Sequence, residues 1–323
     1  MKTAYKAVGL FLTLALALAC GESTAQSYPT RPVKFVVGYL PGGATDAVAR
    51  IIAPKLSERI GQPVIVENKP GAESSIATDY SAKSAPDGYT LYLGGSGGMV
   101  YNPHLYSNLP YNTVRDFVAI TLFASNSLVV AVHPTLPVKS LNELIALARA
   151  KPGQVFYSAG ATQNHVASEF FKKLAGVNLV HVPYKGGGPA TTAAVAGEVS
   201  LVVTSIADTL AQIRAGKLRA LAVTGQKRAA FLPDVPTVLE SSGLPLEGGM
   251  WIGLFAPAAT PRPIVDRLYA DLSVVLNGLK ERLTSLGYET GGTGMPPAEF
   301  DAMFKSEYAK WGKIMKDLNI RAE

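Results

Sequence analysis

Short apolar runs alternate with amphipathic stretches along most of the chain. The run "VKFVV" at 33–37 predicts a buried strand, and apolar residues spaced three and four apart over 44–60 predict a helix after it. Further apolar runs predict strands at 64–66, 89–93, 128–132, 155–159, 179–182, 199–203, 218–223 and 251–256. Strands that alternate with helices of this length predict an α/β protein with mostly parallel sheets.

Helix-end signals add to this pattern. Ser140 and Glu143 form a capping box before "LIALARA", which predicts a helix start there. A second helical face over 166–174 ends at Gly176. The last predicted helix carries one apolar stripe, made of Phe300, Met303, Phe304, Tyr308, Trp311, Met315 and Leu318. No Pro-, Gly- or Ser-rich linker divides the chain, so two domains would be joined by crossing strands.

The first 25 residues are typical of a signal peptide. The apolar run 7–19 is too short to span a bilayer, and small residues follow it up to Ala25. We expect cleavage after Ala25 and export to the periplasm. A lipoprotein anchored at Cys20 is the alternative, which we disfavour because Ala17 stands where a lipobox usually has Leu. Without Cys20 the mature chain has no cysteine, so its core must hold it together.

Composition, charge and motifs exclude several classes of function. The chain has 323 residues, of which 48% are hydrophobic and 17% charged, enough for two core-forming domains. Its formal charge is +6 with scattered Lys and Arg, which argues against nucleic-acid binding and weakly favours small anions. The sequence holds no H-x-x-x-H pair, no G-x-G-x-x-G after a strand and no P-loop. We therefore expect no metal, no cofactor and no nucleic-acid partner.

Three glycine-rich corners, at 40–46, 158–165 and 183–189, each join an apolar strand to a helix start. A helix start carries up to four unpaired N–H groups and a partial positive charge, and glycines let an anion approach them. Gly42 and Gly43 could thus open a helix end to a carboxylate. The alternative is an ordinary turn that needs glycine for positive φ. Nearby, Asp46 would either cap its own helix or meet a cationic part of a ligand.

One enzyme motif is present. Gly94-Gly95-Ser96-Gly97-Gly98 fits G-x-S-x-G directly after a predicted strand, as in a serine hydrolase, and Asp116 with a later histidine keeps the Ser, Asp, His order. Such an elbow needs a helix immediately after it, whereas Pro103 follows within a few residues. Three aromatic residues with polar tips, Tyr39, Tyr184 and Trp251, are either ligand contacts or packing residues.

Several segments in order resemble one known family. They are "PGGATDAVAR", "GQPVIVENKPGA", "HVPYKGGGPA", "AGKLRALAVT" and "LPDVPTVLESSG". They are similar to the substrate-binding receptors of tripartite tricarboxylate transporters, the Bug family. The resemblance implies a periplasmic two-domain binding protein of the Venus flytrap type (type II-like), with a ligand cleft between domain 1, residues 27–128 plus 248–323, and domain 2, residues 129–247. It also implies delivery of a small organic carboxylate to a membrane permease of one large and one small subunit. We expect the receptor itself to be a monomer.

The resemblance also implies ligand residues. Family members bind the carboxylate near the first corner, here Pro41-Gly42-Gly43, and near a G-[ST]-x-x-H corner, here Thr162 with His165. This chain departs from the family pattern at Leu40, at Ala161, over 71–77 and at Thr204, so we expect a ligand with polar groups besides one carboxylate. The candidate ligand-binding residues are Tyr39, Pro41, Gly42, Gly43, Thr45, Asp46, Ser74, Ser75, Ser96, Gly160, Thr162, His165, Tyr184, Thr204 and Asp208.

Three hypotheses remain open on the sequence. The one we favour is a binding protein for a small organic acid, with no catalytic residue. The others are a secreted serine hydrolase using Ser96, and a ligand-sensing receptor that feeds a sensor kinase.

Overall fold

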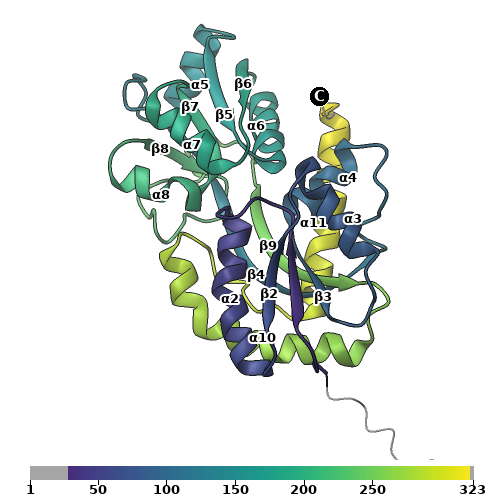
Figure 1. The fold of residues 1–323 in the computed structure, drawn as a ribbon. Helices are drawn as coiled ribbons and strands as arrows, with labels where there is room; N and C mark the ends of the chain where they lie inside the picture. The colour runs from purple at the N-terminus through teal and green to yellow at the C-terminus, as the bar shows by residue number, and fades with distance from the viewer. Residues whose placement is uncertain (1–27, 321–323) are drawn as a thin grey trace, which may run out of the picture.

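The computed structural model describes residues 28–320 (Figure 1). The predicted signal peptide, with both possible processing sites at Ala25 and Cys20, lies outside the described residues. Within them, no helix combines the length and the apolar character that crossing a membrane would need.

A mixed sheet forms the centre of the molecule. Its path is β2-β1-β3-β9-β4-β7-β5-β6, and β8 also pairs with β4. The strands are β1 (Val33–Val37), β2 (Val64–Asn68), β3 (Thr90–Gly95), β4 (Phe117–Val132), β5 (Val155–Ala159), β6 (Leu179–Pro183), β7 (Leu201–Ser205), β8 (Arg219–Val223) and β9 (Gly249–Pro257). Strand β4 pairs with β9 over residues 117–127 and with β7 and β8 over residues 128–132. It therefore runs through both halves of the sheet.

We call residues 28–128 with 248–320 lobe 1, and residues 129–247 lobe 2. Figure 1 shows the two as separate bodies of helices around each half of the sheet, with β4 passing between them. Asn126 on β4 secures the crossing, because its side chain donates to the Gly287 carbonyl at 2.6 Å and accepts from the Ile206 amide at 3.0 Å. One buried amide side chain thus ties an element of each lobe to the shared strand.

Helices cover the sheet halves. They are α2 (Ala44–Ile60), α3 (Ser75–Ala82), α4 (Asn102–Leu105), α5 (Leu141–Ala150), α6 (Thr162–Ala175), α7 (Gly187–Ala196), α8 (Ile206–Arg214), α9 (Val238–Ser242), α10 (Arg262–Ser285) and α11 (Pro297–Leu318), with short turns η1 (Ala72–Ser74) and η2 (Gly97–Tyr101). In lobe 1, α2 and α10 share one core with the sheet, and α3 and α11 share another on the opposite face. Lobe 1 is therefore a three-layer α/β unit.

The lobes also share packing beyond β4. Val166 of α6, in lobe 2, is fully buried in the aromatic core of lobe 1. On the same helix, Phe170 lies edge-on to Trp311 of α11, with ring centroids 6.2 Å apart. This contact holds the start of α6 against lobe 1.

The predicted strands and helices are largely confirmed, with three differences. Strand β4 begins at Phe117 rather than 128, because polar Ser125, Asn126 and Ser127 break its apolar pattern. Helices α3, α4, α8, α9 and α10 have no counterpart among the predicted elements. The expected parallel pairing is wrong at the centre, where β4 pairs antiparallel with β7, β8 and β9, because a strand crossing between lobes meets strands that run back.

Candidate functional site

The first glycine corner follows β1 and turns into α2. Gly42 has φ +86°, a conformation that favours glycine, so the turn itself needs this residue. Its amide donates to Asp46 Oδ2 at 2.8 Å. Asp46 also accepts from Arg50 at 2.8 Å and from Asn68 at 2.9 Å. The amide of Gly42 is thus already bonded, and Asp46 braces its own helix instead of facing a ligand.

The charge of Asp46 is well compensated. Burial by itself raises the pKa of this carboxyl, but the hydrogen bonds from Arg50, Gly42 and Asn68 outweigh that effect and hold the pKa below its usual range. The amides that follow, on Ala44 and Thr45, have no acceptor among the described residues. Pro41 and Gly42 are exposed at the tip, while Thr45 is buried. The start of α2 therefore presents free N–H groups.

The second corner brings lobe 2 against lobe 1. An ideal Cβ on Gly97 of lobe 1 would lie 2.7 Å from Gln163 Oε1 and 3.1 Å from the Tyr39 hydroxyl, so these two side chains converge on this glycine. Thr162 Oγ1 lies 3.3 Å from Asn102 Oδ1 and 3.5 Å from Glu73 Oε2. Helix α6 has no side-chain cap at its start. Its N-terminal end therefore opens onto the junction between lobes.

The third corner meets the second within lobe 2. Gly160 packs so tightly against the Gly186 carbonyl that a Cβ would collide with it. A Cβ on Gly187 would likewise collide with the carboxylate of Asp208. Helix α7, which begins at Gly187, has no side-chain cap either. The second and third corners and the first turn of α8 thus lie together.

A short hydrogen-bond chain crosses this region. Asn164 Nδ2 donates to Thr204 Oγ1 at 3.1 Å, and Thr204 Oγ1 donates to Asp208 Oδ2 at 3.3 Å. Burial raises the pKa of Asp208, and the hydrogen bond from Thr204 lowers it in part. Asp208 also raises the pKa of Tyr288, second to burial. The Cβ position of Gly287, beside Tyr288, lies 3.2 Å from Ala207 Cα, so the start of α8 packs against this loop. Because Tyr288 donates to the Ala44 carbonyl at 3.1 Å, this region adjoins the start of α2.

The segment before α3 is strained. Ala72, Glu73 and Ser74 have φ of +45°, +48° and +73°, although none is glycine. Ser74 is buried and packs against Gly38 and Gly98. Ser75 accepts from the Tyr111 hydroxyl at 3.0 Å. Strain of this kind persists where surrounding contacts hold it, and it is common at ligand sites.

Ser96 does not have the setting of a hydrolase nucleophile. It is buried, and its hydroxyl has no hydrogen-bond partner among the described residues, a histidine included. Its φ and ψ of −51° and −36° are helical rather than strained. The expectation that no helix follows is wrong, because η2 and α4 continue from Gly97 through Pro103. The position still faces the junction, one residue before Gly97.

Three of the sequence candidates lie elsewhere. The His165 ring stacks on His181 with centroids 4.3 Å apart, beside Tyr157. The Tyr184 hydroxyl donates to Glu198 at 3.3 Å, beyond the far end of α7 from Gly187. Trp251 packs edge-on against Phe300 in the core of lobe 1, at 5.6 Å. Each of these contacts lies within one lobe.

Four residues at the junction were not among the sequence candidates: Gly97, Asn102, Gln163 and Asn164. Gln163 Oε1 and Asn164 Oδ1 are buried without a hydrogen-bond partner among the described residues. Gln163 and Asn164 follow Thr162 directly in the sequence. The first helical turn after a glycine corner is therefore the sequence signal that could have identified them.

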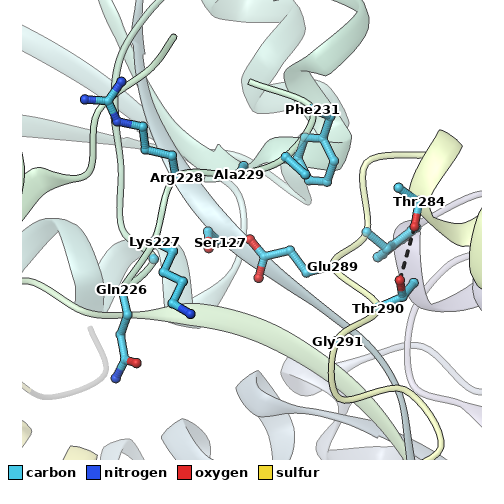
Figure 2. Close-up of a pocket in the computed structure, with 13 residues that line it drawn as sticks. Ser127, Gln226, Lys227, Arg228, Ala229, Phe231, Thr284, Glu289, Thr290 and Gly291 are labelled. Carbon is cyan, nitrogen blue, oxygen red and sulfur yellow. Dashed lines mark hydrogen bonds between the residues drawn. The ribbon is translucent and has the colours of Figure 1, made fainter. Parts of the chain in front are cut away.

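A separate cavity of about 550 Å³ lies between the loops 225–231 and 284–291 (Figure 2). Two pairs of its polar side chains bond to each other: Ser127 donates to Glu289 at 2.7 Å, and Thr284 and Thr290 are 3.1 Å apart. None of the sequence candidates lines it. The helix starts described above hold the sequence candidates and are the better candidate site.

Two α/β lobes joined by a crossing strand, with helix starts facing the junction, define a periplasmic solute-binding protein. The chain belongs to the family described as "Tripartite tricarboxylate transporter family receptor", whose model matches residues 48–320. Family members are periplasmic receptors that serve a transporter, not enzymes, so the hydrolase hypothesis for Ser96 is wrong.

Relatives match nearly the whole chain. Protein BugT of Bordetella pertussis is 36% identical over 319 residues, covering 97% of this chain and 97% of BugT. A structure titled "R. palustris Rpa4515 with adipate" is 33% identical with a TM-score of 0.84, covering 91% of this chain and 99% of that one. "MatC (Rpa3494) from Rhodopseudomonas palustris with bound malate" is 31% identical with a TM-score of 0.81, covering 89% and 99%.

Proposed function

We propose that this chain captures a small organic carboxylate between lobe 1 and lobe 2 and delivers it to a membrane permease. The observation that carries this is the meeting of uncapped helix starts, α2 from lobe 1 and α6 from lobe 2, at one junction. Relatives with 33% and 31% identity hold adipate and malate, which are both carboxylates.

The chemistry of the junction suits an anion. Each helix start offers N–H donors and a partial positive charge worth about 0.3–1 kcal/mol, or ~2 when partly buried. A hydrogen bond to a charged group contributes about 1.5–3 kcal/mol. Two helix ends with three or four such bonds reach, before ordering costs, the roughly 8 kcal/mol that micromolar binding needs.

Closure of the lobes over the ligand would supply the binding free energy that offsets the ordering costs. Because water weakens each of these contacts, the site gains strength when the lobes shut over the ligand. We place the domain boundaries at residues 128/129 and 247/248, where the chain passes between lobes. In this arrangement Thr162 and Gln163 of lobe 2 close against Asn102 and Gly97 of lobe 1.

The site residues follow from this geometry. We assign the ligand contacts to the amides after Gly43, to Thr45, and to Tyr39, Ser74 and Ser96 on lobe 1. On lobe 2 we assign them to Gly160, Thr162, Gln163, Asn164, Thr204 and Asp208. The delivery partner is a permease of one large and one small subunit, and the receptor acts as a monomer in the periplasm after cleavage of its signal peptide at Ala25.

Titration calorimetry against dicarboxylates, citrate, amino acids, aromatic acids and nicotinate tests the proposal, and thermal shifts give an independent readout. We expect saturable binding of at least one acid without turnover. Gly43→Val places a side chain over the start of α2 and should weaken that binding at least tenfold. Gly291→Val, at a glycine that also has room for a side chain, should not. Equal affinity in the two variants would contradict the assignment.

A further inference from the structure

Within the described residues, the half-buried Asp208 has no cation beside it, unlike the buried aspartates Asp46 and Asp271. Asp46 pairs with Arg50 at 2.8 Å, and Asp271 pairs with Arg59 and Arg267 at 2.8 and 2.7 Å. Among residues 28–320, no lysine or arginine forms an ion pair with Asp208. Its contacts are the Thr204 hydroxyl and the backbone of Gly187 at the start of α7. A half-buried carboxylate without a cation beside it leaves a charge that a cationic group of a ligand can compensate.

The neighbours of Asp208 are acceptors as well. The Thr204 hydroxyl has one proton, which it gives to Asp208, so it accepts from Asn164 Nδ2. This chain fixes the amide of Asn164 and leaves its Oδ1 buried and without a partner among the described residues. Gln163 Oε1, on the same turn of α6, is buried and unbonded too. Lobe 2 therefore presents three groups that need hydrogen-bond donors.

A ligand that carries only carboxylates has no donor for these groups at neutral pH. A protonated amine has three donors and a positive charge. The start of α2, with its free amides, contacts the Tyr288 hydroxyl, and Gly287 beside Tyr288 packs against Ala207, the chain neighbour of Asp208. One end of the junction thus suits an anion and the other suits a cation.

Building on the proposed function, we infer that the ligand is an amino acid or another zwitterion, whose carboxylate meets the start of α2 and whose ammonium meets Asp208, Asn164 and Gln163. Adipate and malate, which the two relatives hold, have no amine. Asp208 is then the residue that selects for the amine.

Matched ligands test the inference by calorimetry at pH 7.5 on the purified protein. The sets are L-aspartate, L-malate and succinate; L-glutamate, 2-hydroxyglutarate and glutarate; and 4-aminobutyrate and butyrate. In at least one set we expect the amine to bind at least tenfold more tightly than the hydroxyl or unsubstituted compound. Asp208→Asn should bring that ratio close to one, because it removes the charge but keeps the shape.

Asp301→Asn, on the surface of α11, removes the same charge and should leave the ratio unchanged. If the unsubstituted or hydroxy acids bind as tightly as their amines, the inference is overturned while carboxylate capture stands. If Asp208→Asn keeps the full preference, Asp208 is not the selecting residue and the inference is again overturned. If no acid of any kind binds, the proposed function fails with it. The wild-type ratios need no variant, so a folding defect in Asp208→Asn leaves the test decisive.

Discussion

Thr162 Oγ1, on the first residue of α6, lies 3.3 Å from Asn102 Oδ1 on α4, and this contact joins the two lobes. The same hydroxyl lies 3.5 Å from Glu73 Oε2. Burial raises the pKa of Glu73, and the hydrogen bond from Thr162 lowers it in part. The contact sits at the mouth of the proposed site, so it belongs to the closed arrangement of the lobes.

Thr162→Val should weaken ligand binding about tenfold, or about 1.4 kcal/mol, because the closed state loses one polar contact between lobes. Valine keeps the shape of threonine, so the melting temperature should change little. Calorimetry with the best-bound acid gives the dissociation constant. Thr192→Val is the control, since its hydroxyl bonds only the Gly188 carbonyl on the exposed side of α7. Equal dissociation constants in the two variants would show that the contact plays no part in closure.

Gly97→Ala tests the close approach of Gln163 and Tyr39. A Cβ there would lie 2.7 Å from Gln163 Oε1, so the lobes could not close to the same distance. We expect at least a tenfold loss of affinity, while the free protein stays folded because its lobes can separate. Gly278→Ala has open space around it in α10, and should add about 0.5–1 kcal/mol of stability without changing affinity. Unchanged binding by Gly97→Ala would refute this role.

The sequence predicts individual strands and helices well and the junction less well. Strands such as β1 and β5, and helices such as α2, are local patterns, and their predicted bounds match. Helix α10 was within reach too, because Val265, Leu268, Leu272 and Leu276 repeat at helical spacing and are buried. The spacing of apolar residues could not predict that β4 crosses between the lobes. The polar residues in the middle of β4 have hydrogen-bond partners far along the chain, such as Gly287.

The sequence also predicts the site residues only in part. The glycine corners marked the helix starts, and the structure brings two of them into direct contact at Gly160 and Gly186. Which side chains point between the lobes depends on tertiary packing. His165 turns to His181 on lobe 2, whereas its neighbours Gln163 and Asn164 are buried at the junction. Successive residues of a helix point in directions about 100° apart. One position along α6 therefore decides whether a side chain faces the junction, and a sequence motif does not specify that direction.

The strained turn at Ala72 makes a prediction about stability. A residue with a Cβ loses about 1–2 kcal/mol in the left-handed region, and glycine there avoids that loss but adds about 0.5–1 kcal/mol of unfolded-state entropy. Ala72→Gly should therefore stabilise the protein by about 0.5 kcal/mol in urea unfolding. The same change at Ala146, exposed on α5, should destabilise it by about 1 kcal/mol. If both variants lose stability to the same degree, the turn is not strained.

Asp208→Asn should make the free protein more stable at neutral pH, even though it weakens binding. Burial raises the pKa of Asp208 above the roughly 3.9 expected in the unfolded chain. Above the raised value both states are ionised, so the folded state bears the full penalty of an enclosed, unpaired charge. Between the two values the folded state binds more protons, so stability rises as the pH falls, and below the unfolded value the penalty is gone.

The melting temperatures of Asp208→Asn and wild type should therefore differ most at pH 7.5, by about 2 °C for about 1 kcal/mol in a chain of this size, and should converge toward pH 4. Asp46→Asn should change the melting temperature in the opposite direction. The pKa of Asp46 is lowered, so this substitution should cost most at neutral pH and least when acid has already protonated the wild-type carboxyl. A wild type that is more stable than Asp208→Asn at pH 7.5 would mean that the carboxylate is compensated within the protein, and that it does not wait for a cationic ligand.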